Sequence, residues 1–198
     1  AFRSSDGGKS WSGGGICTPW DYKHDSAILV GNTVFTGNRD GAFYWDDKEK
    51  TWKPVRGCLT NEIGSEIYAL VSFCGDIYAS SVNGVFVSRD DGKSWESFNS
   101  GLPENHQIRN FAVKDTFLFA GGAAVYRRSK NEKSWVVVSK KIEGAEEKVV
   151  VSNGNVIRVA AYNQSNDGKF CKIFLSSDNV SIWKEIPVDL PYTSEAPL

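Results

Sequence analysis

The sequence predicts an all-β repeat protein, and three observations lead to that prediction. An eight-residue motif with the pattern S-x-D-x-G-x-S-W occurs at residues 4–11 and again at residues 88–95. Full or decayed copies end in tryptophans at positions 11, 52, 95, 135 and 183, so the motif recurs every 40 to 48 residues, a period typical of repeat architectures. Between the copies lie short runs of β-branched and aromatic residues bounded by glycine turns, without sustained helical periodicity.

The third repeat shows the predicted structural unit most clearly. Its first segment, residues 67–73, is almost continuously apolar, as expected for a strand that is buried on both faces. Tight turns are predicted at Cys74-Gly75 and at Asn83-Gly84, and the D-x-G turn of the motif precedes the last segment. The predicted strands of this repeat are 67–73, 76–81, 85–88 and 95–98.

The same layout fits the neighbouring repeats. The second repeat places strands at 27–30, 33–36, 42–45 and 51–55, the fourth at 108–113, 117–120, 124–126 and 135–138, and the fifth at 148–151, 156–161, 173–175 and 183–186. The first repeat supplies only an outer half, at residues 1–4 and 11–15. Four antiparallel strands per repeat, with the first most apolar and the last most polar and exposed, predict the blades of a β-propeller.

We therefore interpret the chain as a single β-propeller domain or part of one. Its repeats span approximately 1–16, 26–57, 66–98, 107–138 and 147–187, and a tail follows at 188–198. A closed ring would need two further inner strands, and the prolines at 187 and 191 cannot donate to a strand ladder. The ring is either an irregular five-bladed one or part of a larger propeller that remaining blades or a partner chain complete, and we favour the larger ring.

The repeated motif resembles the Asp-box, or BNR repeat, of sialidases and other propellers of the sialidase-like and sortilin-like superfamily. Both full copies match at every defined position, and the five copies span nearly the whole chain. In that family the box lies at the periphery, so we interpret its residues as a hairpin staple in which Asp accepts hydrogen bonds from turn amides and Gly allows positive φ. The residues of this structural motif are Ser4, Asp6, Gly8, Trp11, Trp52, Ser88, Asp90, Gly92, Trp95, Trp135, Asp178 and Trp183.

Three decayed copies depart from the motif at identifiable positions. The second copy keeps the acid as Asp47, the fourth has Lys130 in place of the acid, and the fifth has Val180 in place of glycine. A staple can be lost from one blade without destroying a site that several blades share. The decay therefore favours a structural role for the motif.

The resemblance also implies what a sialidase would need, namely three arginines that clamp a carboxylate, a Tyr–Glu pair, an Asp acid/base and an F/Y-R-I-P motif before the first box. Here Phe2-Arg3 runs directly into Ser4-Ser5, and no arginine stands at equivalent inner-strand starts in three successive repeats. We therefore assign no catalytic residues and lean against an enzyme. A fragment of a sialidase-like glycoside hydrolase is the alternative.

A binding site is expected where loops converge. In a blade, the fourth-to-first and second-to-third connections share one face, opposite the Asp-boxes, which we call the loop-rich face. Aromatic rings beside Asn, Asp and Arg on this face suit a sugar or a peptide, although Trp20 and Tyr22 could simply pack a long loop and both histidines could be solvated. The candidate ligand-binding residues are Trp20, Tyr22, His24, Asp25, Arg39, Asp40, Arg56, Glu62 and His106.

The predicted function is a non-catalytic binding scaffold for a glycan or a protein, and a structural or assembly-factor propeller is a further alternative. Lys+Arg 23 against Asp+Glu 24 gives a net charge of -1, which argues against a nucleic-acid partner. No apolar run approaches the roughly 18 residues of a membrane helix, so we expect no membrane insertion.

The four cysteines, Cys17, Cys58, Cys74 and Cys171, have no metal-ligand spacing, so neither a metal nor another cofactor is predicted. They would form two disulfides in a secreted protein or remain four buried thiols in the cytoplasm. Sequons at Asn163 and Asn179 favour a secreted, lumenal or cell-surface location, with a cytoplasmic one as the alternative. The chain lacks Met and starts at Ala1, as expected of a processed form or a fragment.

Overall fold

The computed structural model describes residues 2–3, 6–10, 12–13, 26–55, 66–104, 107–139, 147–153, 156–163, 170–177, 180 and 182–187. Every regular element in these residues is a β-strand, as the sequence predicts. A small sheet pairs β1 (Phe2–Arg3) with β2 (Ser12–Gly13).

Four further sheets each contain four antiparallel strands that follow one another in chain order. The first sheet comprises β3 (Ser26–Val30), β4 (Thr33–Asn38), β5 (Gly41–Asp46) and β6 (Thr51–Pro54). The second comprises β7 (Ile67–Phe73), β8 (Asp76–Ser81), β9 (Gly84–Ser88) and β10 (Glu96–Ser97). The third comprises β11 (Asn110–Lys114), β12 (Phe117–Gly121), β13 (Val125–Ser129) and β14 (Val136–Val137). The fourth comprises β15 (Glu147–Asn153), β16 (Val156–Asn163), β17 (Phe170–Ser176) and β18 (Lys184–Ile186).

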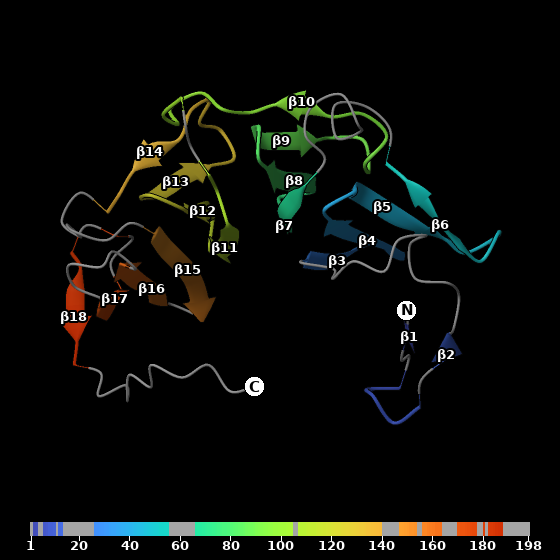
Figure 1. Ribbon diagram of the computed structural model, residues 1–198, viewed down its shortest axis with the longest axis horizontal. Helices are drawn as coiled ribbons and strands as arrows, with labels where there is room; N and C mark the ends of the chain where they lie inside the picture. Colours follow the sequence, from blue (N-terminus) through green and yellow to red (C-terminus); the bar gives the residue numbers. More distant parts are fainter. Residues whose placement is uncertain are drawn as a thin grey trace.

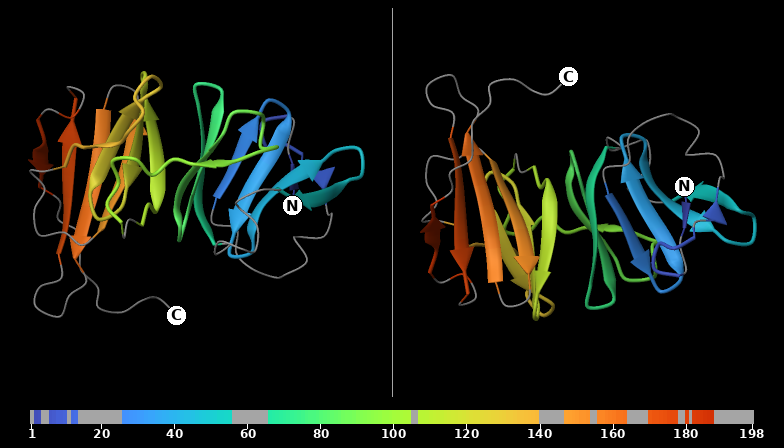
Figure 2. Two further views of the ribbon diagram at one scale, coloured as in Figure 1. Left: turned by 90° about the horizontal axis from the view of Figure 1, so that it is seen from above. Right: turned by 90° about the horizontal axis from the view of Figure 1, so that it is seen from below.

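The four sheets stand side by side in an arc, as propeller blades do (Figure 1). Strands β3, β7, β11 and β15 lie on the concave side of the arc, and β6, β10, β14 and β18 lie on its outer side. Figure 2 shows neighbouring sheets packed face to face with their strands running in similar directions. We refer to the sheets as blades 2 to 5, after the repeats that form them.

A hydrophobic core lies between each pair of neighbouring blades, because successive side chains of a strand point to opposite faces. In β8, Ile77 and Ala79 pack with residues of blade 2, whereas Tyr78 packs with residues of blade 4. In β16, Ile157 and Val159 pack with residues of blade 4. Each interior blade therefore contributes one face to each of two cores.

The strand predicted to be most buried is not the most buried one. The second strands β4, β8 and β12 are mostly buried, whereas β3 alternates between half-buried and exposed residues and Leu29 is 62% exposed. The reason is that the innermost strand is an edge strand on the concave side, whereas the second strand has a hydrogen-bonded neighbour on each side. The outer strands are the most exposed, as predicted.

Polar groups connect the inner strands of neighbouring blades. The hydroxyl of Ser26 in β3 accepts a hydrogen bond from the Leu70 amide of β7 at 2.9 Å. The side-chain amide of Asn110 in β11 pairs with both backbone groups of Val150 in β15. Lys148 is buried at the same boundary and donates from Nζ to the Ala123 carbonyl at 2.7 Å, and its burial lowers the pKa of that ammonium. These contacts hold the blades in register.

The structure corrects the expectation for the cysteines. Cys74 lies in the β7–β8 turn as an exposed free thiol. Neither two disulfides that use all four cysteines nor four buried thiols agree with this position. Cys17, Cys58 and the side chain of Cys171 lie outside the described residues. Among the residues that the structure describes, no helix has the length and apolarity needed to cross a membrane.

Candidate functional site

The Asp-box of blade 3 forms a closely hydrogen-bonded turn between β9 and β10. The Asp90 carboxylate accepts hydrogen bonds from the Ser94 amide at 2.8 Å and the Ser94 hydroxyl at 2.6 Å. The Ser88 hydroxyl donates to Asp90 and accepts from the Gly92 amide at 2.8 Å. Gly92 has a φ of 81°, which favours glycine, and its carbonyl accepts the indole N–H of Trp95 at 3.1 Å.

The first copy repeats the central part of this geometry. Asp6 accepts hydrogen bonds from the Ser10 amide at 2.9 Å and the Ser10 hydroxyl at 2.5 Å, and Gly8 has a φ of 88°. Ser4 and Trp11 of this copy lie outside the described residues, as does Asp178 of the fifth copy. The acid therefore makes the same two contacts in both full copies of the motif.

In blade 2 the turn uses a different acid from the one the motif predicts. Asp46, one residue before Asp47, accepts the amides of Lys48 and Glu49 at 2.9 and 3.0 Å. Lys53 lies 2.7 Å from Asp46, and this contact, with those amides, lowers the pKa of the carboxyl to about 2. Asp47 pairs instead with Lys50 at 2.9 Å. The positive φ also moves to Lys50, so this hairpin turns without the staple.

In blade 4, where Lys130 replaces the acid, an arginine stabilises the turn by donating hydrogen bonds to its carbonyls. Arg128 stands at the position of Ser88 and is only 2% exposed. Its guanidinium donates to the carbonyls of Ser129, Lys130 and Glu132 at 3.0 to 3.2 Å. The same group lies 4.0 Å over the ring of Phe98 in blade 3. Arg128 thus binds turn carbonyls where Asp90 binds turn amides.

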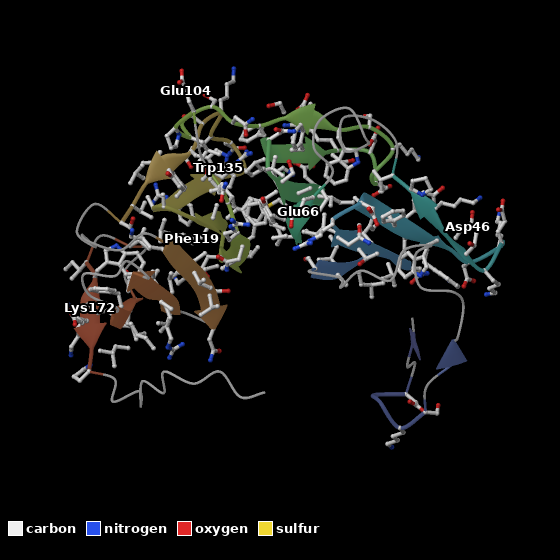
Figure 3. The ribbon with its side chains drawn as sticks, viewed as in Figure 1. Asp46, Glu66, Glu104, Phe119, Trp135 and Lys172 are labelled. Atoms are coloured by element: carbon white, nitrogen blue, oxygen red, sulfur yellow. The ribbon has the colours of Figure 1, made fainter. Side chains whose placement is uncertain are left out.

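The tryptophans of the motif connect one blade with the preceding one. Trp135 and Trp183 donate their indole N–H groups to the carbonyls of Phe98 and Val138, at 3.0 and 2.8 Å, and both acceptors follow the outer strand of the preceding blade. Figure 3 shows Trp135 on the side of its sheet that faces blade 3. Trp52 is only half-buried and packs edge-on against Trp45, with ring centroids 5.4 Å apart.

Only two of the predicted ligand-binding residues belong to the described part of the chain. Arg39 and Asp40 form the β4–β5 turn on the loop-rich face. The predicted Trp20, Tyr22, His24, Asp25, Arg56, Glu62 and His106 lie outside the described residues. The assignment of these seven residues to one site therefore stays a prediction.

Arg39 and Asp40 belong to a larger group on this face, which we call the charged cluster and which consists of Arg39, Asp40, Glu66, Tyr68 and Arg109. Arg39 of blade 2 lies 3.6 Å from Glu66 at the start of β7, and its side chain is 70% exposed. Figure 3 shows Glu66 beside the inner end of β7, toward blade 2. The Asp40 amide donates to Asn38 at 2.8 Å, and one Asp40 oxygen is buried without a hydrogen-bond partner among the described residues.

Tyr68 and Arg109 extend the charged cluster from blade 3 to blade 4. The guanidinium of Arg109 lies 4.2 Å from the centre of the Tyr68 ring, and Gln107 accepts a hydrogen bond from it at 2.6 Å. Tyr68 has no partner in the β7–β8 register, because the pairing shifts between Ile67 and Ala69. Such a β-bulge re-aims a side chain and commonly occurs beside functional sites.

Sequence reasoning missed Glu66, Tyr68 and Arg109. Tyr68 lies within an apolar run, a pattern that predicts a buried core position. A signal was available for Glu66, a charged residue immediately before the predicted strand 67–73, whereas Arg109 lies inside the predicted strand 108–113 and precedes the inner strand only in the structure. The cluster offers two guanidinium groups, two carboxylates and an aromatic ring. Among the described residues no group of three or more His, Cys, Asp or Glu could hold a metal ion.

No protein-family model and no curated protein matches this chain. Among solved structures it is similar to an ancestral GH74 enzyme, with a TM-score of 0.69 and 15% identity over 93% of this chain and 28% of that one. It is also similar to the GH74 enzyme of Niastella koreensis, with a TM-score of 0.62 and 16% identity over 77% of this chain and 27% of that one.

A third similar structure is the extracellular domain of a candidate hybrid two component system from B. thetaiotaomicron, with a TM-score of 0.67 and 12% identity over 90% of this chain and 24% of that one. At such identities the likeness shows the fold alone, which is that of a β-propeller. The chain spans about a quarter of the length of these structures.

Proposed function

We propose that this chain is part of a non-catalytic β-propeller that binds a protein partner through its loop-rich face. The charged cluster is the observation that carries the proposal, because it places two arginines and a tyrosine from three blades on one face. Arginine and tyrosine are enriched in protein interfaces and among the residues that dominate binding energy. The mixed charges of the cluster suit a partner that offers both carboxylates and basic groups.

The cluster is held in place before any partner binds. Arg109 is fixed by the Tyr68 ring and by Gln107, so little side-chain freedom is lost when it contacts a ligand. Arg39, which is largely exposed, can exchange Glu66 for a carboxylate of the partner at small cost. We expect Arg109 and Tyr68 to supply most of the affinity and Arg39 to contribute chiefly to the association rate.

Three alternatives give different experimental results. A glycan ligand would give a signal on a glycan array that is lost when Tyr68 is changed. A sialidase-like hydrolase would release sialic acid from a fluorogenic substrate. An assembly factor would co-purify with a multi-subunit complex. We also propose a secreted or cell-surface location, which the extracellular domain among the similar structures and the two sequons support.

We further propose that blades from outside these 198 residues complete the ring, contributed by the same polypeptide or by a partner chain of different sequence. Two exposed apolar residues support this: Leu29 faces away from blade 3 and Val151 faces away from blade 4, at 62% and 50% exposure. Light scattering on the isolated chain tests it. A monomer agrees with completion from outside, whereas a closed dimer would show that a second copy of the chain fills the ring.

A photo-crosslinking residue at position 39 tests the binding proposal directly. The matched control carries the same residue at position 48, in the β5–β6 turn on the opposite face. We expect a partner that crosslinks at position 39 alone. The purified partner should then bind Arg109→Glu and Tyr68→Ala variants at least about tenfold more weakly than the unchanged protein, since loss of a central interface residue costs more than about 1.4 kcal/mol. Equal crosslinking at both positions, or unchanged affinity in both variants, would contradict the proposal.

A further inference from the structure

A cavity lies on the opposite face of the propeller, between blade 2 and the Asp-box turn of blade 3. Its volume is about 410 Å³, within the roughly 300–1,000 Å³ of small-molecule sites. In Figure 1 the turn between β9 and β10 lies beside β5 and β6, and these segments supply most of the lining. Its lining residues are Thr33, Phe35, Tyr44, Pro54, Asp91, Gly92 and Lys93.

The walls of this cavity are held in place by packing and hydrogen bonds. Phe35 is buried, and its ring centroid lies 6.3 Å from that of Tyr44 at an interplanar angle of 41°. Gly92 lies directly against Phe35, so closely that an added Cβ would lie 2.6 Å from Cε1 of that ring. The hydrogen bonds of Asp90 fix the turn that carries Asp91 and Lys93. The cavity is therefore present without a ligand.

The chemistry of the lining selects among ligands. The rings of Tyr44 and Pro54 offer an apolar surface against which the C–H face of a sugar can pack. Asp91 and Lys93 are exposed at the rim, and neither forms an ion pair within the described residues. One accepts and the other donates hydrogen bonds, and the hydroxyls of Thr33 and Tyr44 do both. Because the two charges cancel, the rim disfavours strongly charged ligands and matches a neutral molecule with many hydroxyl groups.

We propose that this cavity binds a single neutral pyranose ring, with Tyr44 and Pro54 against its apolar face and Asp91 and Lys93 on its hydroxyls. The inference is independent of the proposed function, because the cavity and the charged cluster lie on opposite faces and share no residue. The Asp-box turn of blade 3 thus acquires a second role, since it staples its hairpin and also forms one wall of a sugar site.

Amide chemical shifts of the isotope-labelled 198-residue chain test this proposal during titration with neutral methyl pyranosides of glucose, galactose, mannose and xylose. We expect at least one of them to shift the Tyr44, Gly92 and Lys93 amides in a saturable way. Glucuronate should bind no more tightly than the methyl glucoside, because Asp91 offsets the attraction of Lys93 for its carboxylate. Lys93→Ala should weaken binding about tenfold through loss of one charge-assisted hydrogen bond.

Variants make the result specific to the cavity. Tyr44→Ala should abolish binding, but this change also removes packing against Phe35 and so could affect folding. Lys93 is exposed, so the Lys93→Ala variant tests sugar binding without disturbing the fold. Arg109→Ala on the loop-rich face should bind the sugar unchanged. Absence of saturable shifts with all four sugars would overturn the proposal, as would equal binding by the Lys93→Ala chain or tighter binding of glucuronate.

Discussion

The carboxylate of Asp90 organises the β9–β10 turn, because its two oxygens accept hydrogen bonds from the amide and the hydroxyl of Ser94. These bonds, with a further one from the Ser88 hydroxyl, lower the pKa of Asp90 from 3.8 to about 2. The folded protein therefore binds this proton more weakly than the unfolded chain does. Ionisation of Asp90 stabilises the fold, and that stabilisation depends on pH.

We expect the contribution of Asp90 to the free energy of unfolding to be complete above pH 3.8 and to disappear as the pH falls toward 2. A carboxyl whose pKa is lowered by folding stabilises the folded protein only while it is ionised, and acidification removes that charge. An Asp90→Asn variant should be less stable than the unchanged protein at neutral pH, and this difference should shrink between pH 4 and pH 2. Urea unfolding monitored by tryptophan fluorescence measures it. Asp91→Asn, one residue away, is the control, because it removes a neighbouring charge and keeps both hydrogen bonds from Ser94 to Asp90.

Arg128 is the second residue whose contacts permit a quantitative prediction. Its substitution by Ala removes three hydrogen bonds to turn carbonyls and the packing of the guanidinium on Phe98. We expect a loss of about 2–4 kcal/mol in the free energy of unfolding, since hydrogen bonds to buried charged groups contribute about 1.5–3 kcal/mol.

Two comparisons distinguish the geometry of Arg128 from its charge. Arg128→Lys keeps the charge but cannot donate to three carbonyls at once, so it should recover less than half of the loss. Arg89→Ala breaks ion pairs with Asp76 and Glu96, and because the Arg89 side chain is about half exposed, the change should cost under about 1 kcal/mol. Equal losses in the Arg128→Ala and Arg89→Ala variants would show that the staple of blade 4 is not Arg128.

In a turn that contacts a neighbouring blade, a glycine is difficult to replace for two reasons. Its positive φ is unfavourable for other residues, and the neighbouring blade leaves no space for a Cβ. Gly92 and Gly75 have similar φ values of 81° and 88°, but an added Cβ would meet Phe35 of blade 2 at Gly92 and nothing within 4 Å at Gly75. Gly75→Ala should therefore cost only the left-handed backbone penalty of about 1–2 kcal/mol. Gly92→Ala should cost about 1–3 kcal/mol more, because the ring of Phe35 must move.

Thermal or urea unfolding of the two alanine variants measures this difference. It also reports on the cavity, since Gly92 and Phe35 both line it. Gly92→Ala should shift the amides of Phe35 and Tyr44, whereas Gly75→Ala should leave both unchanged. Equal destabilisation by the two variants would mean that the turn and blade 2 are not in close contact.

The strands could be predicted from the sequence because each blade repeats one local pattern. Apolar alternation and glycine turns place β8 and β9 within a residue of their predicted bounds. The staples were harder to predict, because they depend on which side chain reaches which backbone group. Asp46 replaces Asp47 through a shifted turn, and Arg128 takes over from an acid that is absent from blade 4.

The candidate site could be predicted only in part for a similar reason. Arg39 and Asp40 lie between the predicted strands 33–36 and 42–45, so the topology alone assigns them to the loop-rich face. Tyr68 reaches that face through a bulge, which a period of two along the strand does not reveal. The sugar cavity depends on the approach of blade 3 to blade 2, a tertiary contact without a local signal in the sequence.

The molecule as a whole is a row of blades in which each blade packs only against its neighbours. The three hydrophobic cores each combine residues of two adjacent blades. Stability in such an arrangement is approximately a sum of blade terms and nearest-neighbour terms, so damage at one boundary should remain local. Two glycines at different boundaries allow this expectation to be tested with matched substitutions.

Gly37 and Gly121 stand at equivalent positions opposite Ser26 and Asn110 of the inner strands. A Cβ at Gly37 would clash with Cγ2 of Ile67 in blade 3 and lie 2.8 Å from its Cβ. A Cβ at Gly121 would clash with the Lys148 carbonyl oxygen of blade 5 and with Oδ1 of Asn110, and would lie 3.1 Å from the Val150 amide nitrogen. Each Gly→Ala change should cost about 1–3 kcal/mol by overpacking. Gly121→Ala should accelerate hydrogen exchange in β15–β17 and leave β3–β5 protected, and Gly37→Ala should do the reverse. If both variants accelerate exchange equally in all four blades, the cores between blades are coupled over the whole molecule, and the additive description of the propeller is wrong.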